Sequence, residues 1–553
     1  MTTAPGLEIR DWRNTTTPSL NGTALKLKSY EISRSLALAP DGQRCLLGTG
    51  WYLRLFDRRG VEQWQGDAPG EAKSVNIAGN GQVAVAAFSD GPIRWYRLRD
   101  GQELLAFFPH NDRKRWVLWP PSGYYDAAPG AEDCIGWQVN RGPAQEADFC
   151  PVGQCRVAFY RPDVVARVLD TLDEAEALRQ ANAEANRRQE ALVLQQRLPP
   201  VVQILAPQDS ATVSPSPLTV RFSLRTPSGE PVSAIKGLVD GRPVAQTRGL
   251  QVTATTEDAT RELPLPIPPR DCEVVVIAEN RYATSVPATM RLRWQGTPAP
   301  DDFVVKPKLY ALAVGVSRYQ NPSLTLDFPA KDAQDLTAAL RRQQGKLYHG
   351  VEVRLLTDAQ AHREAVLDGL EWLQRQTTSK DVAAIFVAGH GVNDPNGNYS
   401  FLPANIDPER LKSTGVAFTE FKNTVAALAG KVRFFLDTCH AGNVMQQEKR
   451  RAILDIAGVI NELASAENGA VVFAASTGNQ YSLENAAWGN GAFTQALVEG
   501  FQGKADYRQS GRITVNMLDL YLSERVKDLT QGRQTPTTTK PPSTPDFPVA
   551  LVP

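Results

Sequence analysis

The chain has 553 residues, a formal net charge of zero and 22% charged residues. At about 150 residues per domain, this length predicts three or four domains. The neutral charge gives no support for nucleic acid or an anionic membrane as a partner. No apolar run approaches the roughly 18 residues that span a bilayer, and the first residues lack the apolar core of a signal peptide.

The six cysteines are scattered, without the spacing of a metal site or a disulfide framework. Cys150 and Cys155 are near enough in the chain to pair, but two buried thiols are the favoured interpretation in a reducing compartment. We therefore expect a cytoplasmic protein that needs no metal or other cofactor.

A diverged repeat occupies the N-terminal part of the chain. "SLALAPDGQ" begins at Ser35 and recurs as "SVNIAGNGQ" from Ser74, a shift of 39 residues. A period near 40 residues, with Asp/Asn-Gly turns and aromatic strands, resembles the blades of WD40-type propellers. A third, weaker unit covers Trp116–Gly142. Closed propellers typically have four or more blades, so the resemblance implies a partial propeller over residues 1–158, which covers its edges differently or is completed by a partner chain.

Two further segments precede the C-terminal half. Residues 159–198 are rich in alanine and charge, with Pro162 near the start and no Gly or Pro in the helical stretch that follows. Val165, Leu169 and Leu172 recur at helical spacing, which predicts one long helix that acts as a spacer between domains. Residues 199–297 consist of short β-rich runs between Pro, Gly and Ser turns. They resemble an immunoglobulin-like (Ig-like) β-sandwich.

From Leu309 the pattern changes to strands that alternate with helices, which predicts a mostly parallel sheet covered on both faces. We expect this α/β domain to span residues 308–530. Residues 531–553 contain six prolines, so an extended C-terminus without a core of its own is expected.

Two apolar runs of this domain stop at reactive side chains. "IFVAGHG" ends at His390 and Gly391, and "FFLDTCHAG" carries Cys439, 49 residues after the histidine. Both runs are typical of strands buried on both faces, and open parallel sheets hold ligands at the carboxyl ends of their strands. Adjacent strands lie about 4.8 Å apart, which would bring the imidazole close to the thiol. Because a histidine can convert a cysteine to its nucleophilic thiolate, the pattern predicts a cysteine protease.

"DTCHAG" around Cys439, with "FAASTGNQYSLE" and "GNGAFTQALVEGFQGKAD" downstream, resembles the caspase-like peptidases. This group includes caspases, metacaspases and bacterial orthocaspases, and a histidine about fifty residues before the cysteine is one of its known signatures. The nucleophile motif is closer to the metacaspase type. The resemblance implies a six-stranded, mostly parallel sheet in which the third and fourth strands are adjacent.

Cys439 is the predicted nucleophile, and His390 is the predicted base and leaving-group acid. We favour His390 over His440 because successive strand residues point to opposite faces, which turns His440 away from the thiol. The resemblance implies an oxyanion hole formed by the backbone N–H groups of Gly391 and Cys439. The sequence indicates no third partner for His390, so we expect a catalytic dyad.

Specificity is expected to come from acidic residues. Asp437 lies two residues before Cys439 and therefore shares its face of the strand. By resemblance, Asp332 is a second pocket acid and Ser476 a weaker candidate. Two carboxylates favour an arginine or lysine at P1, the substrate residue before the cleaved bond. A helix-N-terminal acid stabilised by the macrodipole is an equally favoured interpretation of Asp332. The loop Thr477–Trp488 is the next candidate region.

The segment "NVMQQEKRR" after the nucleophile is expected to be either an activation loop that is cut at Lys449, Arg450 or Arg451, or an ordinary solvated loop. Calcium-requiring metacaspases carry an acid a few residues after the nucleophile. Here no acid occurs before Glu448, so calcium activation is not expected.

These features predict an endopeptidase that cleaves proteins after Arg or Lys, acting as a regulated effector in bacterial cell-death or immune signalling. By family analogy, a bacterial gasdermin is one candidate substrate, and a regulatory protein is expected on the WD40-like or Ig-like domain. The alternative is a catalytically degenerate scaffold or sensor that acts through its β-domains. The presence of both His390 and Cys439, each near a glycine, argues against that alternative.

Overall fold

The structure is a computed structural model. It describes residues 3–4, 7–143, 147–185, 187, 194–214, 217–252, 259–295, 306–393, 398–428, 430–440, 456–465, 469–476, 482–541 and 544–552. The chain divides into two compact units, one formed by residues 1–134 and 159–189 and the other by residues 135–158 and 190–553. Within the described ranges, no helix has both the length and the apolar character needed to cross a membrane.

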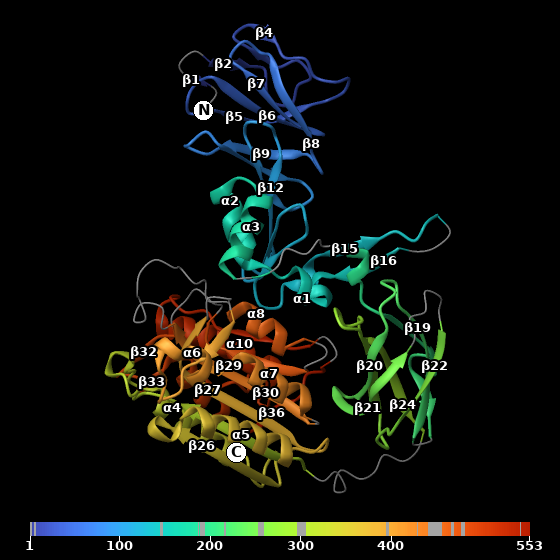
Figure 1. Ribbon diagram of the computed structural model, residues 1–553, viewed down its shortest axis with the longest axis vertical. Helices are drawn as coiled ribbons and strands as arrows, with labels where there is room; N and C mark the ends of the chain where they lie inside the picture. The colour runs from blue at the N-terminus through green and yellow to red at the C-terminus, as the bar shows by residue number, and fades with distance from the viewer. Residues whose placement is uncertain are drawn as a thin grey trace. The chain divides into compact units, whose positions relative to one another are not determined.

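The first unit contains three antiparallel sheets (Figure 1). The β5–β8 sheet shares one apolar core with β9, β10 and β11. It shares a second core, which includes Leu7, Leu20 and Phe56, with the β1–β4 segment. The strands are β1 Thr3–Ala4, β2 Leu7–Arg10, β3 Ser19–Leu20, β4 Thr23–Ala24, β5 Ser33–Leu38, β6 Arg44–Thr49, β7 Tyr52–Asp57, β8 Glu62–Asp67, β9 Ala72–Ile77, β10 Val83–Phe88, β11 Ile93–Arg97, β12 Glu103–Pro109, β13 Trp116–Trp119 and β14 Asp126–Ala127.

The internal repeat corresponds to two successive four-stranded meanders. β5 and β9 begin at Ser33 and Ala72, and β6 and β10 begin at Arg44 and Val83, so both pairs repeat the 39-residue shift. The weaker third unit forms no sheet of its own, because β13 and β14 extend the sheet of β9–β12. The rest of this third repeat contains β15 (Gly136–Val139), which pairs with β16 (Asp148–Pro151). Both strands belong to the second compact unit of the chain.

The prediction of one long helix is wrong. Helix α2 (Pro162–Thr171) ends at Leu172, whose φ of 53° is left-handed, and α3 (Glu174–Glu184) begins after Asp173. The Asp173 carboxylate caps α3 by accepting the Glu176 N–H at 3.0 Å. The carbonyl of Leu172 accepts a hydrogen bond from the Arg97 guanidinium at 2.9 Å. The two helices therefore belong to the first unit and are not a spacer.

Within the second unit, residues 201–294 form a two-sheet β-sandwich. One sheet has the order β17-β19-β22 and the other β18-β24-β23-β20-β21, and they enclose a core that includes Phe222, Val274 and Val276. The strands are β17 Val201–Ala206, β18 Ala211–Val213, β19 Leu218–Arg225, β20 Val232–Val239, β21 Arg242–Val252, β22 Ala259–Leu265, β23 Cys272–Glu279 and β24 Ala288–Trp294. Short helical turns precede it, at η2 Val152–Cys155, α1 Arg156–Phe159 and η3 Leu194–Arg197.

The C-terminal part is an α/β domain in three layers (Figure 1). Its central sheet has the order β26-β25-β27-β30-β31-β35, in which the first five strands are parallel and β35 is antiparallel. This confirms the predicted sheet and the adjacency of the third and fourth strands. The strands are β25 Lys308–Gly315, β26 Gly350–Thr357, β27 Val382–Asn393, β28 Tyr399–Phe401, β29 Val416–Ala417, β30 Lys431–His440, β31 Ala470–Ala474, β32 Glu484–Asn485, β33 Asn490–Gly491, β34 Arg512–Thr514, β35 Thr537–Thr539 and β36 Pro548–Leu551.

Helices cover both faces of this sheet. Apolar side chains of α5, α7 and α8 form the core on one face, and those of α4, α9 and α10 form the core on the other. The helices are α4 Pro329–Arg341, α5 Arg363–Gln376, α6 Leu411–Thr414, α7 Phe418–Ala427, α8 Ile456–Leu463, α9 Ala492–Glu499 and α10 Val515–Thr530, with short turns at η5 Pro322–Leu324, η6 Asp358–Gln360, η7 Pro408–Arg410 and η8 Gly500–Lys504. Because alternate residues of β27 enter opposite cores, the apolar run before His390 is buried on both faces.

The segment after residue 530 is largely extended and is part of this domain. β35 completes the central sheet beside β31, and β36 pairs with β34. Val549 and Ala550 are fully buried, and the buried Arg433 guanidinium of β30 donates to the carbonyls of Pro548 and Val549. The C-terminal strands therefore pack against the strand that carries Cys439.

Candidate active site

His390 and Cys439 lie at paired backbone positions of two adjacent parallel strands. In the register of β27 and β30, His390 pairs with Cys439, Ala388 with Asp437 and Gly391 with His440. The structure describes the backbone of Cys439, and this backbone position lies at the carboxyl end of β30. The predicted meeting of the two residues at one edge of the sheet therefore agrees with the strand register.

The imidazole of His390 is oriented by a backbone carbonyl. Its ring is buried, and Nε2 lies 3.1 Å from the carbonyl oxygen of Leu324 at the end of η5. A carbonyl can only accept a hydrogen bond, so Nε2 carries the proton and Nδ1 is the basic nitrogen. In this tautomer a neutral imidazole can take a proton at Nδ1. Sequence reasoning missed this partner because a backbone carbonyl leaves no trace in the residue type.

The two glycines beside His390 allow tyrosines to approach the strand closely. Gly389 has a φ of 141°, and a Cβ there would lie 2.9 Å from the hydroxyl of Tyr319. A Cβ on Gly391 would lie 2.1 Å from the hydroxyl of Tyr399. The Tyr319 hydroxyl accepts the backbone N–H of His390 at 2.9 Å, and the two rings lie 5.4 Å apart between centroids. Both positions therefore require glycine.

Asp332 and Asp437 flank Gly491, although more than a hundred residues separate them in the chain. A Cβ on Gly491 would lie 3.2 Å from Oδ2 of Asp332 and 3.4 Å from Oδ2 of Asp437. Asp332 lies in the first turn of α4 and is 2% exposed, and Asp437 on β30 is 5% exposed. Within the described residues, neither carboxylate makes an ion pair. The structure thus brings the two predicted pocket acids together.

Hydrogen bonds from one segment hold this pair of acids. Asn490 Nδ2 donates to Oδ1 of Asp332 at 2.9 Å, and the backbone N–H of Gly491 donates to the same oxygen at 3.1 Å. The Thr494 hydroxyl donates to Oδ2 of Asp437 at 2.9 Å. These donors come from β33 and the first turn of α9, so this segment supplies polar contacts to both carboxylates.

The pKa values of the three neighbouring carboxyl groups Asp332, Asp437 and Glu484 are all raised. Burial, and next the charge of Asp437, raise the pKa of Asp332 well above its usual range. Burial also raises the pKa of Asp437. Burial, with a smaller effect from Asp437, raises the pKa of Glu484 on β32 to about 7. Like charges in a desolvated site disfavour one another, whereas a cation would favour the ionised forms.

Glu484 was not singled out from the sequence. It lies in the loop named there as the next region to examine, and its Oε2 accepts the backbone N–H of Asp327 at 3.1 Å. Ser476 is buried just beyond β31. Lys449, Arg450 and Arg451 lie outside the described residues. In the part of the chain that the structure describes, no cluster of three or more His, Cys, Asp or Glu side chains is arranged to hold a metal.

The domain is thus a three-layer α/β domain with a histidine opposite a cysteine at the carboxyl ends of two central strands. The family model of the caspase domain matches residues 308–548, so a caspase domain occupies this part of the chain. The match extends to residue 548, beyond the predicted boundary at 530, and therefore includes β35. The family model does not extend to the β-rich region that precedes the domain. For that region, the WD40-like and Ig-like resemblances stay predictions.

No curated protein matches the chain. Among solved structures, the chain is similar to protein GSU0716 from Geobacter sulfurreducens, with 18% sequence identity and a TM-score of 0.32. That similarity covers 43% of this chain and 95% of the other.

Proposed function

We propose that the caspase domain is a cysteine endopeptidase that cleaves proteins after arginine or lysine, with Cys439 and His390 as its dyad. The observation that carries the specificity is the buried pair Asp332 and Asp437, which has no cationic partner among the described residues. A guanidinium at P1 would place two N–H donors opposite these carboxylates. Glu484 adds a third carboxyl group, and Ser476 remains a weaker pocket candidate.

In the proposed reaction, Nδ1 of His390 takes the proton of the Cys439 thiol, and the thiolate attacks the carbonyl carbon of the scissile bond. The backbone N–H groups of Gly391 and Cys439 stabilise the resulting oxyanion. His390 then gives its proton to the leaving amine. A water molecule, deprotonated by His390, hydrolyses the thioester and restores the thiol. The Nε2 contact with Leu324 supports this assignment, because it leaves Nδ1 as the basic nitrogen.

The biological setting is proposed by analogy alone. A caspase domain implies protein substrates, and we propose a regulated effector of bacterial cell-death or immune signalling that acts in the cytoplasm. A bacterial gasdermin is a candidate substrate. The N-terminal β-rich unit and the β-sandwich are the proposed sites of a regulatory protein, and cleavage at Lys449, Arg450 or Arg451 is a proposed activation step.

The test is hydrolysis of a peptide library that varies only at P1, by the full chain and by Cys439→Ala and His390→Ala. Wild-type protein should cleave after Arg and Lys, and each variant should lose turnover while its melting temperature stays close to wild type. Because the two residues act as a unit, the double variant should be little worse than either single one. Cys134→Ala is the matched control, since Cys134 is a free thiol in the first unit.

Substantial turnover by either single variant would contradict the dyad. A wild-type protein that neither cleaves the library nor reacts with a cysteine-directed probe bearing a basic P1 group would instead support the degenerate scaffold.

A further inference from the structure

A pair of cysteines, Cys150 and Cys155, lies outside the caspase domain and is not part of the proposed peptidase. The side chains of Cys150 and Cys155 are in contact across the turn that leads from β16 into η2, and their Sγ atoms lie 3.7 Å apart. Both side chains are buried, and both are free thiols. Two sulfur atoms at this distance are in van der Waals contact, so a movement of about 1.7 Å would bring them to the length of a disulfide bond.

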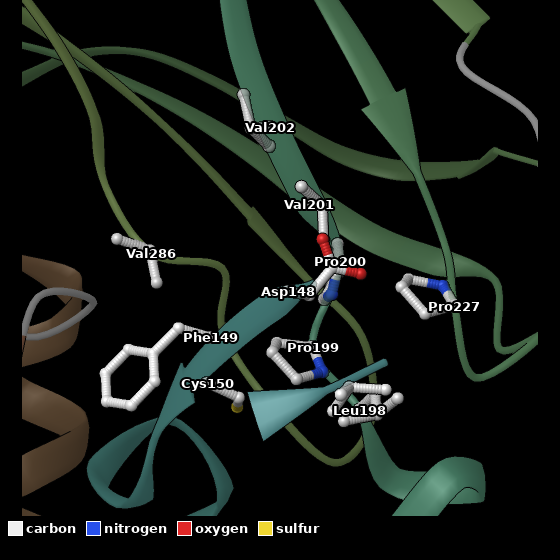
Figure 2. A pocket seen from close by; sticks show the side chains of 11 residues that line it. Asp148, Phe149, Cys150, Leu198, Pro199, Pro200, Val201, Val202, Pro227 and Val286 are labelled. Atoms are coloured by element: carbon white, nitrogen blue, oxygen red, sulfur yellow. The ribbon is translucent and has the colours of Figure 1, made fainter. Parts of the chain in front are cut away.

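The two cysteines differ in their relation to one pocket in the described part of this unit. Cys150 lines an apolar pocket of about 240 Å³, whereas Cys155 does not line it (Figure 2). Val201, Val202 and Pro199 form part of the same wall, and Phe149 and Val286 at the pocket are 58% and 47% exposed. A small molecule that enters past these exposed side chains therefore meets Cys150 first.

The environment of Cys155 fits a second, resolving role. Its thiol lies 3.7 Å from the carbonyl oxygen of Arg197. Its contact with the Cys150 thiol, and then burial, raise the pKa of Cys155. A thiol with a raised pKa reacts slowly with a peroxide, so Cys155 is suited to the second step, in which it attacks the adjacent Cys150 sulfur.

We propose that Cys150 and Cys155 are a reversible oxidation site for hydrogen peroxide that enters this pocket. The Cys150 thiolate attacks a peroxide oxygen, the O–O bond breaks, and Cys150 sulfenic acid and hydroxide form. The Cys155 thiolate then attacks the Cys150 sulfur and expels hydroxide, which forms the disulfide. The two thiol protons convert the two hydroxides to water, and the peroxide has gained two electrons. An added dithiol reverses the reaction by exchange.

The site can be tested on the full-length protein with hydrogen peroxide as the probe. After treatment, the protein is denatured, alkylated with iodoacetamide and digested with trypsin. Both cysteines fall in one tryptic peptide, Gly142–Arg156. The expected product is this peptide lacking two hydrogen atoms and carrying no alkyl group. It should form at least about tenfold faster than the loss of alkylation at Cys272, a buried free thiol that serves as the internal control.

Single variants test the order of the two steps. In Cys155→Ser, Cys150 should stop at the sulfenic acid, which dimedone captures. In Cys150→Ser, Cys155 should remain alkylatable, because it does not line the pocket. Val286→Trp places a larger side chain at an exposed position of the pocket and leaves both thiols in place. If the peroxide enters through the pocket, this variant should form the disulfide more slowly than wild type.

The proposal is overturned if the Gly142–Arg156 peptide stays reduced while Cys272 is oxidised, or if the disulfide joins two chains. Unchanged oxidation of Cys155 in Cys150→Ser would overturn the assigned order, and an unchanged rate in Val286→Trp would overturn entry through the pocket. None of these results depends on the peptidase activity, so the two proposals succeed or fail separately.

Discussion

Replacing Asp437 with asparagine should separate the function of the acidic pocket from its effect on stability. The substitution removes one negative charge from the pair and keeps an oxygen that can accept the Thr494 hydroxyl hydrogen bond. Loss of one member of a buried charge pair typically costs about 2–5 kcal/mol. From the lower end of that range, kcat/KM on Arg and Lys peptides should fall by roughly 30-fold or more. Peptides with a neutral P1 residue should change little, because they never bind the carboxylate.

The same substitution should not weaken the fold at alkaline pH. Burial raises the folded-state pKa of Asp437 above its unfolded value, so the folded state binds the proton more tightly. The stability associated with this group is present below the unfolded pKa and is lost as pH rises through the folded pKa. Asparagine carries no such penalty. At about pH 8 the melting temperature of Asp437→Asn should equal or exceed that of wild type, and this advantage should shrink towards about pH 5.

The assay combines steady-state kinetics on paired Arg and norleucine peptides with thermal melts at the two pH values. Asp506→Asn is the matched control, because Asp506 accepts backbone hydrogen bonds from Ser510 and Gly511 in an exposed loop. It should leave the ratio of Arg to norleucine cleavage unchanged. The acidic-pocket assignment is refuted if Asp437→Asn keeps the wild-type ratio, or if it melts lower at alkaline pH and loses both activities equally.

Three further predictions concern the same domain. Tyr319→Phe removes the hydroxyl that accepts the His390 N–H and should lower kcat about fivefold to tenfold with little change in KM. The control variant Tyr521→Phe loses a comparable buried hydrogen bond to Glu499 and should leave kcat unchanged. Equal effects of the two substitutions on kcat would argue against a positioning role for Tyr319. The pKa of Glu484 is raised to about 7, so kcat/KM on Arg peptides should rise between about pH 6 and pH 8, one unit on either side of that pKa. The Glu484→Gln variant should show a flatter rise. A wild-type pH profile in this variant would exclude Glu484 from the substrate pocket. Mass spectrometry of active protein should detect cuts within residues 449–451 that are absent from the Cys439→Ala variant, and full activity of an uncut chain would rule out activation by self-cleavage.

The α/β domain was largely predictable because its strands are buried on both faces. Such strands appear as unbroken apolar runs between amphipathic helices, and this pattern predicted the mostly parallel sheet that the structure confirms. The adjacency of the third and fourth strands, which the resemblance implied, is confirmed as well. The linker was mispredicted because helical spacing alone was followed across Leu172. The stop signal was present, since Asp173 and Glu176 have the spacing of a capping box at the start of a second helix.

The candidate site was predictable where the chemistry is carried by side chains at strand ends. The register of His390 with Cys439 follows once β27 and β30 are adjacent. The Leu324 carbonyl and the Tyr319 hydroxyl were not predictable in the same way. A carbonyl is common to all residue types, and a tyrosine seventy-one residues before His390 reaches it only through the folded loop after β25. The contribution of Glu484 likewise depends on burial, which spacing does not show.

The acidic pair has a physical cost that a purely structural role does not explain. Two buried carboxylates close to Gly491 repel each other, and the hydrogen bonds from Asn490 and Thr494 oppose this effect but leave the pKa of both acids raised. Replacing buried charges by apolar groups often leaves a fold equally stable or makes it more stable. A domain that keeps both acids side by side therefore gains something outside its own folding. A cationic side chain that arrives with the substrate would supply the missing charge, and it would do so only during binding, when selectivity is decided.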